Sequence, residues 1–105
     1  MKVGIDLTHI ERFKNKDFLA KSILCDSELI EYEKSINKAQ YLASRFALKE
    51  ALIKCLELSI LSVKLSTIHV MKKENGAVYI DYMGKEYNCS LSHEEDYCVG
   101  IVIND

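Results

Sequence analysis

Hydrophobic positions in the first half of the chain predict one short strand followed by helices. The apolar segment Lys2–Asp6 ends in a carboxylate and predicts the first strand. Thr8 and Glu11 have the spacing of a capping box, which predicts a short helix through Phe13. Three further helices are predicted: one near Asp17–Ile23, one over Glu28–Ser35 with Ser27 as its cap, and the longest over about Lys38–Leu58.

The second half of the chain has the alternating and β-branched patterns of strands. Asn75-Gly76 is its strongest hairpin signal. The predicted strands are Thr67–Met71, Ala77–Tyr82, Tyr87–Ser92 and Tyr97–Ile103, with turns at Met83–Lys85 and His93–Asp96. One strand, then helices, then consecutive strands predict an α+β fold, in which a long helix and shorter helices pack on a small, mainly antiparallel sheet.

Size and charge limit the function classes. A chain of 105 residues, 49% hydrophobic and 29% charged, fits a single globular domain over residues 1–105. Its net charge of −2 gives no electrostatic reason to expect nucleic acid as a partner. No segment resembles a signal peptide or approaches the ~20 apolar residues of a membrane span, so we expect a cytoplasmic protein with no membrane partner.

The cysteines are not arranged as metal ligands. No two of them form a Cys-x-x-Cys pair, so a zinc site is not predicted. Reduced, mostly buried thiols are the expected state of all four, which are Cys25, Cys55, Cys89 and Cys98.

Glu50 is the most unusual side chain of the predicted long helix. At 100° per residue it projects into the apolar arc that contains Leu42, Phe46 and Ile53. A bare buried carboxylate costs several kcal/mol, so it must be paired, protonated or bound to a metal. Lys54, one turn later, offers an ordinary i,i+4 salt bridge, and that interpretation stays open beside a functional one.

Asp6 offers a second carboxylate on a rigid element, at the end of the first predicted strand. It either caps the following helix or meets Glu50 in an oxygen-rich site. Mg²⁺ suits such a site because it takes one or two carboxylates and fills its remaining positions with water and substrate phosphates.

Basic residues fit a phosphorylated substrate. Arg45, Lys49 and Lys54 lie on the helix that carries Glu50, and His93 lies beside Ser92 at the rim of the last hairpin. A histidine at such a turn is either simply solvated or a ligand contact. The segment Arg12–Lys21 carries four basic residues against one acidic residue, which indicates a solvated helix face or a docking surface for an acidic protein.

Three motifs together resemble one family over nearly the whole chain. They are Gly4-Ile5-Asp6; Phe46-Ala47-Leu48-Lys49-Glu50-Ala51-Leu52-Ile53-Lys54, preceded by Tyr41-Leu42-Ala43-Ser44-Arg45; and Ser90-Leu91-Ser92-His93 with Asp96-Tyr97. The chain thereby resembles the holo-acyl-carrier-protein synthases, the short bacterial branch of the 4′-phosphopantetheinyl transferases. The resemblance implies a Mg²⁺-dependent transfer of the phosphopantetheine group from coenzyme A to a serine of apo-acyl carrier protein, leaving 3′,5′-ADP, in fatty acid biosynthesis.

The resemblance also implies residue roles. Asp6 and Glu50 match metal-binding carboxylates, and Lys54 matches a lysine beside the coenzyme A phosphates. The proton of the carrier serine is expected to go to Glu50 or to a water on the metal. Three positions match residues that hold the nucleotide end: Arg45, Ser92 and His93. Arg12 on the first helix matches a contact with the acidic acyl carrier protein, and the family implies a homotrimer with each active site between two subunits.

Departures from the family pattern keep two other interpretations open. Glu57-Leu58-Ser59-Ile60 stands where a Gly-rich turn is usual, Ala77 replaces a proline, and only Met83–Lys85 remains where a helix commonly precedes the last hairpin. The chain is therefore alternatively a non-catalytic module that binds coenzyme A or a nucleotide. The third interpretation is an interaction domain in which Glu50 and Lys54 only form a salt bridge.

Overall fold

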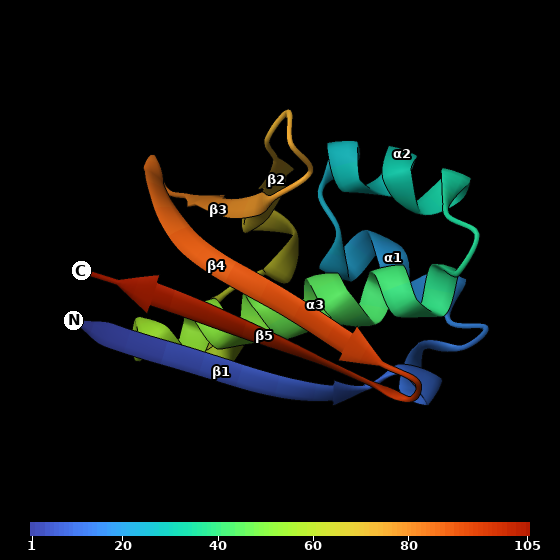
Figure 1. The fold of residues 1–105 in the computed structure, drawn as a ribbon, viewed down its shortest axis with the longest axis horizontal. Coiled ribbons are helices and arrows are strands. Elements are labelled where there is room, and N and C mark those ends of the chain that lie inside the picture. Colours follow the sequence, from blue (N-terminus) through green and yellow to red (C-terminus); the bar gives the residue numbers. More distant parts are fainter.

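The computed structural model describes residues 1–105 as a five-stranded antiparallel sheet with three α-helices (Figure 1). The elements are β1 (Lys2–His9), η1 (Ile10–Phe13), α1 (Asp17–Ile23), α2 (Asp26–Lys34), α3 (Lys38–Cys55), η2 (Ile60–Ser62), η3 (Leu65–Thr67), β2 (His69–Lys72), β3 (Val78–Tyr82), β4 (Lys85–Glu94) and β5 (Tyr97–Asn104), where η marks a 3₁₀-helix. The strand order is β1-β5-β4-β3-β2. This confirms the predicted α+β class.

Strand β4 joins two parts of the sheet. Its first residues pair with β3, from Lys85 opposite Tyr82 to Asn88 opposite Tyr79. From Asn88 onward it pairs with β5, which in turn pairs with β1 over the whole length of both strands. Figure 1 shows β4 as the curved strand between the β2–β3 hairpin and the β5–β1 pair. The hairpin is thus attached to the rest of the sheet only along the first part of β4.

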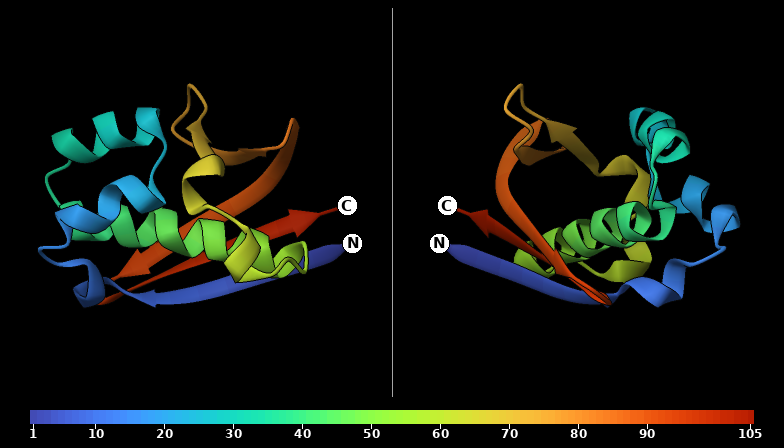
Figure 2. Two further views of the ribbon diagram at one scale, coloured as in Figure 1. Left: turned by 180° about the vertical axis from the view of Figure 1, so that it is seen from behind. Right: turned by 45° about the vertical axis from the view of Figure 1, so that its right-hand side comes forward.

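Helix α3 is buried on both sides. One apolar cluster lies between α3 and the sheet and includes Leu48, Leu52 and Val102. A second cluster joins α3 to η1, α1 and α2 and includes Phe13 and Leu42. Figure 2 shows α3 lying along the sheet, with α1 and α2 gathered near its N-terminal part. Because it packs on both sides, α3 is the central helix of the fold.

Two glycines let α3 approach the sheet closely. A Cβ at Gly4 would overlap the Ala51 carbonyl oxygen and lie only 2.6 Å from the Cys55 amide nitrogen. A Cβ at Gly100 would lie 3.0 Å from the Leu48 amide nitrogen. Both glycines face α3 from neighbouring strands, β1 and β5. The glycine of the first motif is therefore explained by packing, since only a residue without a side chain fits there.

Two predicted helix caps are wrong. Thr8 lies inside β1, and its hydroxyl donates to Asp6 instead of capping a helix. Helix α2 begins at Asp26 with Cys25 as N-cap, so Ser27 lies in its first turn. The predicted short helix through Phe13 is present as η1, and the helix at Asp17–Ile23 has the predicted bounds.

Helix α3 ends three residues before the predicted Leu58. Its last residue is Cys55, and Glu57 follows in a left-handed conformation with φ of 57°. The Leu58 amide donates to the Ile53 carbonyl at 3.0 Å, as in a Schellman ending, where glycine is usual at the left-handed position. Glu57 thus makes the turn that the resemblance assigns to a Gly-rich segment.

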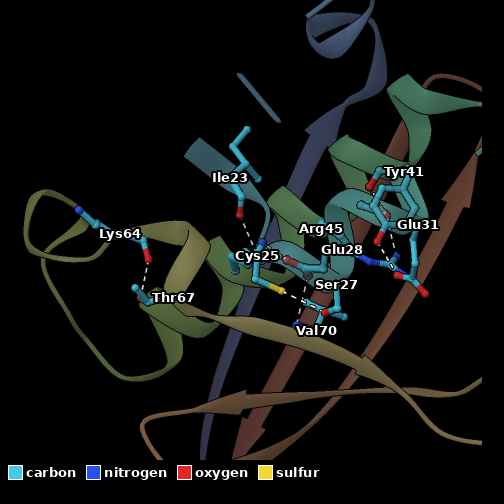
Figure 3. A network of polar contacts seen from close by, with 12 residues as sticks. Ile23, Cys25, Ser27, Glu28, Glu31, Tyr41, Arg45, Lys64, Thr67 and Val70 are labelled. Atoms are coloured by element: carbon cyan, nitrogen blue, oxygen red, sulfur yellow. Dashed lines mark hydrogen bonds and ion pairs between the residues drawn. The ribbon is translucent and has the colours of Figure 1, made fainter. Parts of the chain in front are cut away.

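A fully buried ion pair ties the helices to the edge of the sheet (Figure 3). Lys49 on α3 donates to Glu28 Oε1 on α2 at 2.6 Å and to the Ile23 carbonyl at 2.6 Å. The same Glu28 carboxylate accepts from the backbone amides of Cys25 and Val70, at 2.8 and 3.2 Å. The carboxylate therefore joins three elements, α2, α3 and β2, and the Val70 amide is satisfied although β2 is an edge strand.

The four cysteines are in the predicted state. All of them are free, three are buried, and Cys89 is half-buried. None of the helices has both the length and the apolar character needed to cross a lipid bilayer.

Replacing Lys49 by Met leaves Glu28 as a buried carboxylate without its cation. We expect a loss of about 3–5 kcal/mol in the free energy of unfolding, measured by urea denaturation. The double variant Glu28→Gln, Lys49→Met carries no charge and keeps an amide oxygen for the backbone donors, so it should recover part of that loss. Equal stability of the wild type and Lys49→Met would contradict this account of the buried pair.

Candidate functional site

The structure brings Asp6 and Glu50 together on facing elements. Even-numbered positions of β1 point toward α3, so Asp6 lies on the same face as Gly4 and Thr8. Glu50 immediately precedes Ala51, whose carbonyl oxygen lies against Gly4. The Asp6 charge is close enough to raise the pKa of the Glu50 carboxyl. The predicted meeting of the two carboxylates is therefore a feature of the fold.

Glu50 has an unusual environment for a carboxylate. It is only 9% exposed, and none of the five ion pairs of the chain includes it. Burial is the main cause that raises the pKa of Glu50, and the neighbouring Asp6 charge raises it further. Lys54 and Arg12 act in the opposite direction. The predicted i,i+4 salt bridge between Glu50 and Lys54 is not formed.

Lys54 pairs with Asp6 instead. Its ammonium donates to Asp6 Oδ1 at 3.1 Å and to the Ile5 carbonyl at 3.0 Å. The other carboxylate oxygen, Asp6 Oδ2, accepts from the Thr8 hydroxyl at 2.7 Å. The alternative role of Asp6 as a helix cap is wrong, because its side chain binds Lys54 and Thr8.

The donor set fits a hard divalent cation. Two carboxylates on rigid elements approach each other, and Glu50 has no ion-pair partner in the chain to offset its charge. Mg²⁺ prefers one or two carboxylates supplemented by water and phosphate oxygens. No cluster of three or more His, Cys, Asp or Glu side chains is present, so this chain alone offers Asp6 and Glu50 as a partial coordination shell.

Arg45 and His93 form a second group beside an open depression of about 600 Å³. Arg45 is only 5% exposed, lies 4.3 Å over the Tyr41 ring and donates to the Ser44 hydroxyl at 3.1 Å, but its Nε has no partner. His93 Nδ1 lies 2.6 Å from the Gln40 amide nitrogen. Lys34 and Lys72 also line the depression. Lys72 and Arg45 pair with Glu31 at 3.5 and 3.9 Å, so Lys34 is the lining lysine without an ion pair that can meet an anionic ligand.

The predicted site residues therefore fall into two places. Asp6, Glu50 and Lys54 do not line the depression that Arg45 and His93 share. Ser92 is exposed one residue before His93 on β4. Lys49, one of the basic residues that fit a phosphorylated substrate by sequence, is fully buried against Glu28 and cannot meet such a substrate.

Arg12, the first residue of the basic segment, lies near the carboxylates Asp6 and Glu50. Its guanidinium lies 5.5 Å over the rings of both Phe13 and Phe46, and its charge lowers the pKa of Glu50. It is exposed, as are Lys14 and Lys21. The first residue of the basic segment is thus close enough to the carboxylates for its charge to act on Glu50.

Thr8 and Gln40 are the site residues that sequence reasoning missed. Apolar residues occupy every second position of this segment, at Val3, Ile5 and Leu7. This period of two continues to Thr8 and predicts a strand that extends past Asp6. The capping-box spacing from Thr8 to Glu11 obscured it. No local pattern could have indicated Gln40, because its partner His93 is 53 residues away.

Comparisons with known proteins all point to one family. The model of the 4′-phosphopantetheinyl transferase superfamily matches residues 2–102. The holo-[acyl-carrier-protein] synthase of Staphylococcus carnosus is 35% identical, with 96% of this chain and 93% of that protein covered. That of Mycoplasma mobile is 40% identical, with 96% and 86% covered.

Solved structures with the same fold include two relatives at 25% identity. The holo-[acyl-carrier-protein] synthase of Neisseria meningitidis superposes with a TM-score of 0.86, covering 96% of this chain and 94% of that one. The enzyme of Bacillus anthracis, solved in complex with coenzyme A (3′,5′-ADP), has a TM-score of 0.83 and coverages of 96% and 92%.

Replacing Glu50 by Gln should stabilise the protein at neutral pH. The pKa of Glu50 is raised in the folded state, so its ionised form opposes folding above that pKa, and the penalty disappears as the pH falls and the carboxyl takes up a proton. We expect a gain of about 1 kcal/mol at pH 8 that shrinks toward zero near pH 4. Thermal unfolding of both proteins across this range tests it, and a variant less stable at pH 8 would contradict it.

Proposed function

Because the chain belongs to the 4′-phosphopantetheinyl transferase superfamily, we propose that it transfers the phosphopantetheine group of coenzyme A to a serine of an apo-acyl carrier protein. Its relatives of nearly equal length are holo-[acyl-carrier-protein] synthases. The juxtaposition of Asp6 and Glu50 beside Lys54 carries the proposal, because it supplies the charges that phosphoryl transfer requires.

The reaction joins the serine oxygen to phosphorus and breaks the bond from that phosphorus to the departing 3′,5′-ADP. We assign the serine proton to a Glu50 oxygen, since a carboxylate within hydrogen-bond reach of the attacking hydroxyl can act as its general base. Lys54 is exposed and long enough to turn from Asp6 and stabilise charge on the leaving phosphate. Asp6 and Glu50 would hold Mg²⁺, which when bound neutralises the phosphates and orients them.

We assign the nucleotide end of coenzyme A to the depression beside Arg45 and His93, with Ser92 at its rim. The basic residues along its walls, Lys34, Arg45, Lys72 and His93, support an anionic ligand there. The structures of the Bacillus anthracis and Helicobacter pylori relatives contain coenzyme A or its 3′,5′-ADP part. Their presence supports the same ligand class for this chain.

The carrier protein is proposed to dock on the basic segment. Arg12, Lys14, Lys16 and Lys21 lie on η1, α1 and the connection between them, next to the carboxylate group. Complementary charge speeds encounter and orients the partner, which suits an acidic carrier protein. We also propose that residues 1–105 work as one transferase domain in the cytoplasm, a compartment that keeps the four free thiols reduced.

A homotrimer is proposed through the outer face of β1 and β5. Val3, Ile5 and Leu7 are half to two-thirds exposed, and their partners across the strand pair are Ile103, Ile101 and Val99. Such a contiguous apolar face is typical of an interface between subunits. Because the carboxylate group and the nucleotide depression lie apart in one chain, a site between two subunits would bring one of each together.

Intact-mass spectrometry of apo-acyl carrier proteins incubated with this protein, coenzyme A and Mg²⁺ tests the transfer. We expect a mass gain of one phosphopantetheine group, lost with EDTA and reduced at least about 100-fold by Glu50→Gln. Coenzyme A binding that ignores Mg²⁺, without transfer to several carriers, would instead favour a binding module. Tight binding to a protein without any coenzyme would favour an interaction domain.

Replacing Ile5 by Glu should disrupt the trimer. A charge on the apolar face opposes association, so light scattering coupled to size-exclusion chromatography should show monomers, with transfer reduced accordingly. Ile30→Glu is the matched control, because Ile30 is similarly exposed but lies on α2. If the wild-type protein elutes as a monomer, the trimer proposal is rejected. The transfer proposal is tested separately, by the mass measurement.

A further inference from the structure

Asp6 accepts hydrogen bonds from two side chains, one buried and one exposed. Thr8 donates to Oδ2 at 2.7 Å, and Lys54 donates to Oδ1 at 3.1 Å. Thr8 is 1% exposed, whereas the Lys54 side chain is 56% exposed. One contact is therefore short and enclosed, and the other lies at the surface on a long, flexible side chain.

The enclosed contact is fixed by the backbone of β1. Asp6 and Thr8 are two residues apart on one strand, so their side chains lie on the same face. Thr8 pairs in register with the buried Cys98 of β5, and β-branching restricts its χ1 angle. The Thr8 hydroxyl consequently has little freedom to turn away from Asp6.

The surface contact is easily exchanged. The Lys54 side chain is 56% exposed and that of Asp6 is 15% exposed, so the ammonium can turn from Oδ1 to a phosphate oxygen when a metal cation replaces it at Asp6. Without a second donor, Asp6 would then be free to change its rotamer. With Oδ2 held by Thr8, Oδ1 stays directed toward the region between β1 and α3.

We infer that Thr8 is a positioning residue for the transfer, one that fixes Asp6 so that Oδ1 can bind the divalent cation when Lys54 turns to the phosphates. The inference rests on the proposed function. Groups that orient a metal ligand through a hydrogen bond change metal affinity or activity by about 10–100-fold when removed. Thr8 supplies such a bond from a buried hydroxyl.

The test compares Thr8→Val, which keeps shape and β-branching, with Thr8→Ser, which keeps the hydroxyl. Thr67→Val is the matched control, since the Thr67 hydroxyl is exposed and bonds only to the Lys64 carbonyl. Mn²⁺ binding in the presence of coenzyme A is measured by electron paramagnetic resonance. The Mg²⁺ concentration for half-maximal transfer, kcat and the melting temperature are measured on the same samples.

We expect Thr8→Val to weaken Mn²⁺ binding and raise the half-maximal Mg²⁺ concentration about tenfold or more, while Thr8→Ser and Thr67→Val stay within about threefold of wild type. Wild-type cation affinity in folded Thr8→Val would overturn the inference and leave the transferase proposal standing. A loss of cation affinity in Thr8→Ser as large as that in Thr8→Val would overturn it equally. A wild type that transfers nothing and binds no Mn²⁺ would overturn both.

Discussion

The close approach of α3 to β1 and β5 is the constraint on which the rest of the structure depends. Gly4 and Gly100 leave no Cβ between the strands and the helix, so the backbones of Ala51 and Leu48 lie directly against them. Asp6, two residues after Gly4, then faces Glu50, which immediately precedes Ala51. A side chain at Gly4 would push the helix out and separate the two groups, so the site is a consequence of packing.

Adjacent residues on α3 meet very different environments because the helix is buried on both sides. Lys49 points toward α2 and is neutralised by Glu28, which has further donors in the Cys25 and Val70 amides. Glu50 points toward β1 and has no cation in contact. A satisfied buried pair rigidifies the helix, and an unsatisfied buried carboxylate next to it is destabilising, which is typical of functional groups. The contacts of Lys49 with Glu28 and the Ile23 carbonyl thus fix the orientation of α3 in which Glu50 faces β1.

Much of the fold could be predicted from sequence, but individual contacts could not. Periodicity and turn residues located α1, α3 and the strands within a few residues. The apolar surroundings of Glu50 predicted its burial correctly. The role of Thr8 was mistaken, because a cap and a strand end share the same residue types. The burial of Lys49 was not foreseen, because a lysine within a motif does not reveal which side of its helix is enclosed. Pairings such as Glu28 with Lys49 depend on where separate elements meet.

Strand β4 pairs with β3 along its first part and with β5 along the rest, and this pairing has a consequence for ligand access. The β2–β3 hairpin is attached through the first part of β4 and through the Glu28 contact to Val70, while β1 and β5 are paired along their full length. Amide hydrogens in the hairpin should therefore exchange faster than those in β5, since fewer bonds must open together. Gly76 and Val78 of this segment form one wall of the depression beside Arg45. The depression beside Arg45 thus has one rigid wall, provided by α3, and one wall that should open more easily.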